Sequence, residues 1–113
     1  MEDLEQRWKP VEDMLTGRFG KTPNMEAILL LIGINELNNL TKKKYTKEQK
    51  QDLMHIAVCT LLSQSGYYEA AGYDQDGWPH FKELQPVPKM EMQEQEQFLK
   101  EHIIAYFEDR ADI

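Results

Sequence analysis

The chain has 113 residues, of which 41% are hydrophobic and 29% are charged, and this composition is typical of a folded globular protein, not of a disordered segment. Its net charge of −7 predicts solubility and disfavours non-specific nucleic-acid binding, which needs a basic surface. Cys59 is the only cysteine, which excludes an intrachain disulfide. The length predicts a single domain, residues 1–113. Because no signal-peptide pattern is present, we expect the protein in the reducing cytoplasm.

The first predicted helix runs from about Glu2 to Thr16. A narrow apolar stripe at helical spacing supports it, formed by Leu4, Trp8, Val11 and Leu15. Pro10 interrupts the segment but not the phase of the stripe, which favours one bent helix over two separate helices. Gly17–Pro23 then forms a connection because it holds two glycines and a proline.

The second predicted helix, Met25–Leu40, contains the longest apolar run of the sequence, Ala27–Ile34. The run is far shorter than the roughly 20 residues that cross a bilayer, so we expect no membrane span. One helical face carries Leu30, Gly33, Ile34, Leu37 and Leu40. A second apolar arc lies on the first half of the helix and consists of Ile28, Leu31 and Ile32. Another element of the chain or a second copy of the protein is therefore expected to cover this arc.

The third predicted helix begins at Thr46, with Gln49 completing a capping box, and ends near Gly66. Five lysines lie around its start, and we call them the basic cluster: Lys42, Lys43, Lys44, Lys47 and Lys50. One interpretation is a site for an anion or a nucleic acid. The simpler interpretation is that the lysines complement the negative end of the second helix and solvate a turn. The acidic remainder of the chain makes nucleic acid the less favoured partner.

The stretch Tyr67–Leu84 is rich in aromatic residues and contains a turn signal at Asp74–Gly77. A four-residue loop there predicts a hairpin whose facing pairs are Tyr73 with Trp78, Ala71 with His80, Glu69 with Lys82, and Tyr67 with Leu84. The alternative is that helix continues from Ser65 to Ala71. Gly66 and Gly72 favour the hairpin, and a lone hairpin needs helices to pack against.

The last predicted helix runs from about Glu91 to Asp109. Its apolar stripe is formed by Met92, Leu99, Ile103 and Tyr106 and is widened by Phe98, Ile104 and Phe107. The predicted fold class is therefore all-α: a four-helix, bundle-like domain with a small aromatic β-hairpin or irregular excursion between the third and fourth helices.

Four side chains are weak candidates for a metal site: His55, Cys59, His80 and His102. His55 and Cys59 are four residues apart on a helix, a spacing that can present two ligands to one ion. No spacing brings the other two histidines to them, so no metal, cofactor or catalytic residue is assigned. A small metal-dependent enzyme or metal-binding protein that uses the histidines remains an alternative function.

The leading hypothesis is a non-enzymatic protein–protein interaction module that forms a homodimer. It depends on apolar surface in excess of what a minimal bundle needs. The candidate contact residues are the arc of the second helix and the aromatic residues of the hairpin: Ile28, Leu31, Ile32, Tyr67, Tyr73, Trp78 and Phe81. The expected partner is a second copy or another protein, and not a membrane.

Overall fold

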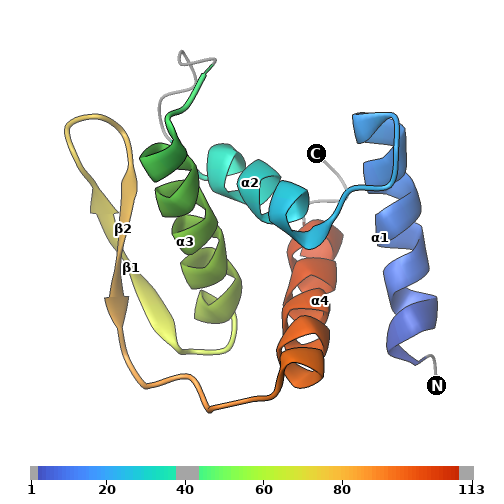
Figure 1. Ribbon diagram of the computed structural model, residues 1–113. Coiled ribbons are helices and arrows are strands. Elements are labelled where there is room, and N and C mark those ends of the chain that lie inside the picture. The colour runs from blue at the N-terminus through green and yellow to red at the C-terminus, as the bar shows by residue number, and fades with distance from the viewer. Residues whose placement is uncertain (1–2, 38–43, 110–113) are drawn as a thin grey trace. The chain divides into compact units, whose positions relative to one another are not determined.

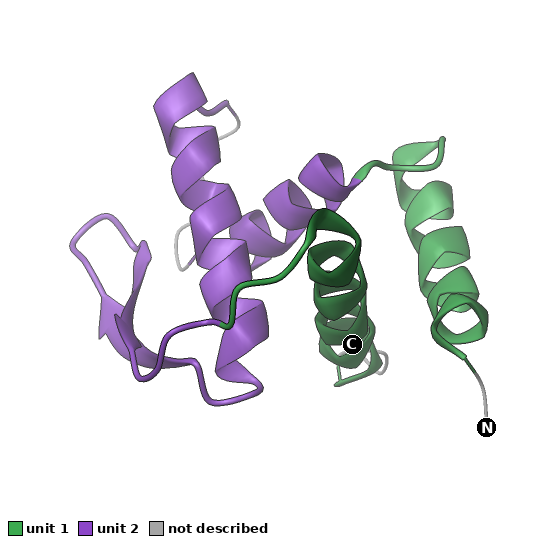
Figure 2. Cartoon of the chain, turned by 60° about the horizontal axis from the view of Figure 1, so that its bottom comes forward, with its two compact units in different colours: residues 1–24, 88–113 green, residues 25–87 purple. Residues whose placement is uncertain are grey.

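The computed structural model describes residues 3–37 and 44–109 (Figure 1). Along the chain the elements are α1 (Leu4–Phe19), α2 (Met25–Asn35), α3 (Lys47–Ser63), β1 (Tyr68–Tyr73), β2 (Pro79–Glu83) and α4 (Met92–Asp109). The chain divides into two compact units (Figure 2): residues 1–24 with 88–113, called here the terminal unit, and residues 25–87, called the central unit. Each unit contains one pair of packed helices, α1 with α4 and α2 with α3.

In the terminal unit, α1 is a single helix that continues through Pro10. Its start is fixed by a capping box between Asp3 and Gln6, which satisfies backbone groups that the first turn leaves without partners. It ends three residues later than predicted, at Phe19, where Gly20 takes a left-handed conformation. The predicted stripe is confirmed as the buried face, with Trp8, Val11 and Leu15 buried.

The α4 helix begins at Met92, close to the predicted start. Its buried side chains lie near its C-terminal end: His102, Ile103, Ile104, Tyr106 and Phe107. Met92 was predicted to belong to the apolar stripe, but its side chain is 87% exposed. The stripe is therefore buried only from about its middle onward, and the first turn of α4 lies in solvent.

In the central unit, α2 packs against α3 at Gly33. A Cβ atom on Gly33 would lie 2.8 Å from the carbonyl carbon of Leu53 and closer still to the carbonyl oxygen, so the two helix backbones touch at this point. A glycine in a helix interior costs about 1 kcal/mol relative to alanine, and here the close approach of the backbones requires it. The helix ends at Asn35, earlier than predicted, and Glu36 and Leu37 follow it outside the helix; residues 38–40 of the predicted helix lie outside the described residues.

The start of α3 is confirmed: Thr46 caps the helix and exchanges hydrogen bonds with Gln49. Along α3, Leu53 and Ile56 join Leu37 in a buried cluster that we call the central core. Partly buried side chains from α2, the segment before α3 and the hairpin pack against it: Leu30, Ile34, Tyr45, Trp78 and Phe81. The predicted face of the second helix and the aromatic hairpin therefore share one core.

The hairpin predicted after α3 is present, which excludes a helix that continues to Ala71. Its strands pair in the predicted register at Glu69 and Lys82. Nearer the turn the register shifts, because β1 contains one more residue than β2 between its pairs, and Tyr73 faces Pro79 and not Trp78. Gly72 lies at this irregularity with a φ of 89°, a conformation that favours glycine.

The predicted fold class was wrong. The helices are present and the hairpin lies between α3 and α4, but the molecule is not an all-α, four-helix bundle. Its helices pack as two pairs, and an antiparallel sheet of β1 and β2 packs on α3 as part of the central unit. The prediction failed because each apolar stripe is compatible with several partners, and the spacing of one stripe does not choose among them. The single domain predicted from length stays a prediction.

Within the two described ranges, no helix has the length and apolar character that a membrane crossing requires.

Candidate functional site

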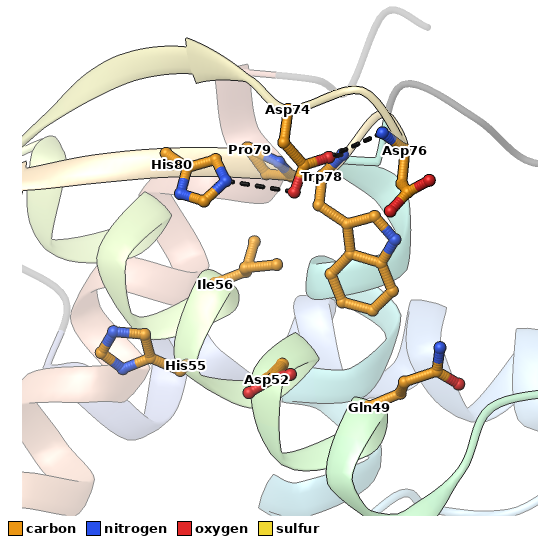
Figure 3. A pocket seen from close by; sticks show the side chains of 9 residues that line it. All are labelled: Gln49, Asp52, His55, Ile56, Asp74, Asp76, Trp78, Pro79 and His80. Atoms are coloured by element: carbon orange, nitrogen blue, oxygen red, sulfur yellow. Dashed lines mark hydrogen bonds and ion pairs between the residues drawn. The ribbon is translucent and has the colours of Figure 1, made fainter.

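The central unit contains an open groove of about 430 Å³ between α3 and the turn of the hairpin (Figure 3). One wall comes from α3 and the other from the turn and the start of β2. The lining residues are Gln49, Asp52, His55, Ile56, Asp74, Asp76, Trp78, Pro79 and His80. The groove gathers charged, aromatic and titratable side chains from both α3 and the hairpin.

The α3 wall of the groove consists of polar side chains and one buried apolar side chain, that of Ile56. Its residues, Gln49, Asp52, His55 and Ile56, recur at the spacing of one helical face. Ile56 is buried in the central core, whereas Asp52 and His55 are exposed. The side chain of Gln49 accepts a hydrogen bond from the backbone of Thr46, so the capping box also fixes this end of the groove.

The turn wall is organised by the carboxylate of Asp74. Its Oδ1 atom accepts hydrogen bonds from the backbone N–H groups of Asp76 (2.9 Å) and Trp78 (3.0 Å), and its Oδ2 atom lies 3.1 Å from Nε2 of His80. The N–H of Trp78 contributes most to holding the pKa of Asp74 below its ordinary value, and His80 and the N–H of Asp76 lower it further. Asp74 is therefore ionised at neutral pH, and its oxygens are occupied in shaping the turn.

Trp78 joins the groove to the core. Its half-buried side chain packs on the central core, and its ring meets the ring of Tyr45 edge-on, with centroids 6.3 Å apart and an interplanar angle of 82°. Figure 3 shows the indole hanging from the turn on the side that faces α3. The groove consequently has an aromatic wall that is held in place by packing on two sides.

The electrostatic character of the groove is acidic. Three aspartates line it, Asp52, Asp74 and Asp76, and no lysine or arginine does. Hydrogen bonds occupy Asp74, but the carboxylates of Asp52 and Asp76 have no hydrogen-bond or ion-pair partner among the described residues. Carboxylates of this kind favour the binding of a ligand that carries positive charge and hydrogen-bond donors.

The groove lining contains no serine, threonine, cysteine, tyrosine or lysine, so the side chains in it that can act as nucleophiles are its aspartates and histidines. The nearest thiol is that of Cys59, whose sulfur lies 3.5 Å from Nε2 of His55. Burial, with a further contribution from the charge of Glu83, raises the pKa of Cys59 to about 11. The thiol is therefore protonated near neutral pH and is not an activated nucleophile.

The candidate metal ligands are only partly brought together. His55 and Cys59 are neighbours, and His55 and His80 line the same groove. His80 is paired with Asp74, and His102 belongs to the terminal unit, where its Nδ1 lies 2.7 Å from the carbonyl oxygen of Phe98. Over residues 3–37 and 44–109, no three histidine, cysteine, aspartate or glutamate side chains form a group that could hold a metal ion.

The predicted interaction residues separate into two sets. Ile28 and Ile32 are buried and Leu31 is half-buried, and a homodimer through this arc stays a prediction. Of the hairpin residues, Tyr73 is 56% exposed and Tyr67, Trp78 and Phe81 are half-buried. Only Trp78 of this predicted set borders the groove.

Sequence reasoning missed the contribution of α3. Asp52 lies one turn before His55 but was not included among the predicted site residues, because a single exposed carboxylate on a helix carries no signal of its own. The available signal was the shared face of Gln49, Asp52, His55 and Ile56, combined with the prediction that the hairpin packs on the helices. The basic cluster does not line the groove: Lys44, Lys47 and Lys50 are exposed elsewhere, and Lys42 and Lys43 lie outside the described residues.

No protein-family model, curated protein or solved structure matches the chain at a significant level. The geometry of the groove is therefore the basis on which a function is argued.

Proposed function

We propose that the protein is a non-enzymatic binding module, and that a segment of a partner protein binds in the groove between α3 and the hairpin turn. The observation that carries the proposal is Trp78, a half-buried tryptophan that borders an open groove while the central core holds its ring. Tryptophan is enriched among the residues that contribute most to protein–protein binding, and such residues lie in pockets with well-packed surroundings.

The arrangement of the turn supports the same proposal. Asp74 bonds to two backbone N–H groups and to His80, so the turn is ordered before any partner arrives. A binding surface that is already ordered loses less conformational entropy on association, and more of the contact energy appears as affinity. The groove is also large enough to receive one or two side chains of a peptide segment.

The partner is proposed to be a different protein, in a reducing cytoplasm where Cys59 remains a thiol. A homodimer through Ile28, Leu31 and Ile32 stays a prediction, but two of these side chains are already buried in a single chain. Light scattering at high protein concentration tests it directly, since self-association raises the measured mass above 13.3 kDa.

Photo-crosslinking in the cells that make the protein tests the binding module. A photoreactive residue is placed at Gln75, which is exposed in the turn between two lining residues, and separately at Glu101, which is exposed on α4. We expect a crosslinked partner from position 75 that is absent or much weaker from position 101. Equal crosslinking at the two positions, or none at position 75, contradicts the proposal.

A further inference from the structure

We infer that the groove recognises a basic segment of the partner, with an arginine side chain bound by Asp52 and Asp76 and a main-chain carbonyl of the same segment bound by the indole N–H of Trp78. This inference rests on the proposed function and names the chemistry of its ligand. It goes beyond the presence of acidic side chains because it uses the hydrogen-bonding capacity of three groups that the chain itself leaves unused.

The first step concerns the carboxylates. Of the three aspartates in the groove, Asp74 is committed to the turn, whereas Asp52 and Asp76 have no partner among the described residues. They come from different elements, Asp52 from α3 and Asp76 from the turn, so they flank the groove from its two walls. Two carboxylates without a neighbouring lysine or arginine favour a cation that can donate several hydrogen bonds at once.

The second step concerns Trp78. Its backbone N–H is bonded to Asp74, but its indole N–H has no hydrogen-bond partner among the described residues. The indole nitrogen is a donor only, so it needs an acceptor from the ligand. A small amine or a bare cation brings no acceptor, whereas a peptide brings a carbonyl oxygen at every residue. The combination of unused acceptors and one unused donor therefore selects a basic peptide segment.

The third step separates arginine from lysine. The guanidinium group is planar, carries five donors and stacks on aromatic faces, whereas the ammonium group is a strongly hydrated point charge. The groove joins an aromatic ring to carboxylates on both of its walls, which suits a planar cation better than a spherical one. An anionic ligand such as a nucleic acid is excluded by the same aspartates, and a second copy of this chain, at −7, is repelled at long range.

The test uses the full chain and two fluorescent peptides of equal length, one of oligo-arginine and one of oligo-citrulline, which has the same shape without the charge. Binding is followed by fluorescence anisotropy, and its location by the NMR shifts of the protein. We expect the arginine peptide to bind more tightly, to weaken as salt is added, and to shift the indole N–H signal of Trp78 and the amides of the groove.

Matched variants separate the groove from the general negative charge of the protein. Asp52→Asn and Asp76→Asn each remove one carboxylate from the groove, and each is expected to weaken binding about fivefold, the effect of one exposed ion pair worth about 1 kcal/mol. Glu48→Gln on α3 and Glu101→Gln on α4 make the same change in net charge at exposed sites outside the lining, and they are expected to change binding by less than about twofold.

Trp78→Phe keeps an aromatic ring on the central core and removes the indole N–H. We expect it to weaken the arginine peptide about fivefold while the protein remains folded, because one neutral hydrogen bond is worth about 1 kcal/mol. Thermal unfolding of each variant shows whether the fold is retained. If this variant unfolds, the wild-type titration shows whether the indole N–H of Trp78 contacts the peptide. An indole N–H signal that does not shift overturns the role of Trp78.

Three outcomes overturn the inference: equal binding of the arginine and citrulline peptides, equal effects of Asp52→Asn and Glu101→Gln, or a salt-sensitive dimer of the protein that Asp52→Asn dissociates. The last would identify the occupant as the basic cluster of a second copy. These results are separable from the proposed function, because a partner crosslinked from Gln75 with no preference for arginine leaves the binding module intact and removes only the ligand chemistry.

Discussion

The two compact units are stabilised by different kinds of contact. In the central unit, α2 and α3 approach so closely at Gly33 that no side chain fits between the glycine and the backbone of Leu53. In the terminal unit, Gly17 of α1 has no neighbouring atom within 4 Å of the position a Cβ would take, and a characteristic contact is the ammonium of Lys100 over the ring of Trp8 at 5.3 Å. The central unit thus contains a close contact between helix backbones, whereas the terminal unit combines a core of buried side chains, such as Leu15 and Ile103, with a long side chain that can adjust.

The difference between the two units indicates which of them must hold its side chains in fixed positions. The groove belongs entirely to the central unit, and both of its walls are held by the core that Gly33 helps to close. A binding site needs its side chains held by rigid elements, so a tight helix pair beneath it is consistent with the proposed function. The terminal unit also has an open groove, of about 390 Å³, whose lining includes Trp8 and several acidic side chains, but there Lys100 supplies a cation that pairs with Glu96. We expect the terminal unit to tolerate substitutions better, because its contacts include long side chains that can adjust.

The largest expected effect is that of Gly33→Ala. The added methyl group would overlap the backbone of Leu53, which cannot move as a flexible side chain can, so α2 and α3 must separate. We expect the free energy of unfolding to fall by about 3 kcal/mol, at the upper end for overpacked cores. Urea unfolding followed by circular dichroism measures the change.

A double variant checks the cause. Because the clash involves the Leu53 backbone, Leu53→Ala should not rescue Gly33→Ala, although it creates space in the core. The two residues are in contact, so their effects need not add, and the double variant is expected to be no more stable than Gly33→Ala alone. A double variant more stable than Gly33→Ala alone would show that side-chain packing, and not backbone contact, sets the distance between the helices.

The second effect follows from the buried thiol of Cys59. Since its pKa is about 11 in the folded protein and 9.0 is its ordinary value, the folded state holds the proton more tightly than the unfolded state. The resulting stability is fully present below pH 9 and is lost as the pH rises through 11. Linkage predicts a loss of about 2–3 kcal/mol across this window, because each tenfold difference in proton affinity between the two states is worth about 1.4 kcal/mol.

The measurement compares the wild type with Cys59→Ala by urea unfolding at several alkaline pH values. The variant is less stable at every pH because the substitution leaves a small cavity. The comparison therefore uses the slope of the free energy of unfolding against pH, and not its absolute value. Because burial and the charges of Cys59 and Glu83 raise the pKa of Tyr68, both proteins are compared in a Tyr68→Phe background, which removes this coupled titration. Parallel slopes would show that the thiol is accessible to water and that the central core is looser than its burial indicates.

Most of the secondary structure could be predicted from the sequence, because its signals are local. The capping box at Thr46 and Gln49, the apolar stripe of α1 and the turn at Asp74–Gly77 each depend on residues within a few positions of one another. The pairing of the helices could not be predicted, since a stripe specifies that a face is buried and not which partner covers it. The shift in the hairpin was also missed, because Gly72 signalled an irregularity without indicating which strand held the extra residue.

The candidate site was predictable only in part. Trp78 was named for its aromatic character, and the turn was recognised from its aspartates and glycine. The groove itself depends on α3 lying beside the hairpin, a contact between residues more than twenty positions apart that leaves no periodic signal. The helical spacing of His55 and Cys59 does bring these two side chains together, and the metal-binding alternative stays a prediction.

A smaller effect of opposite sign is expected in the terminal unit. Gly17 lies in α1 with open space around it and no unusual backbone conformation, so Gly17→Ala adds a methyl group without a clash. We expect the free energy of unfolding to rise by about 0.5–1 kcal/mol through helix propensity. Gly17→Ala and Gly33→Ala are the same chemical change, made once in the terminal unit and once in the central unit. A loss of stability at Gly17, measured by the same urea unfolding, would contradict the open surroundings of this residue.

The smallest effect on global stability is expected at the exposed turn, where Asp74 should instead control local order. Asp74→Ala removes the acceptor of two backbone N–H groups, so hydrogen exchange at Asp76 and Trp78 should accelerate while the strands remain paired. Because the folded pKa of Asp74 is lowered, its contribution is fully present above the ordinary carboxyl pKa and disappears as the pH falls through the lowered value.

Asp74→Asn distinguishes the shape of the side chain from its charge, since it keeps an acceptor oxygen and loses the ion pair with His80. Its exchange protection should lie between that of the wild type and Asp74→Ala and should not change with acid. Protection in the wild type that is also unchanged by acid would mean that the fold alone holds the turn. In that event Trp78 would be positioned by the central core without help from Asp74, and the central unit would order even its most exposed end through packing.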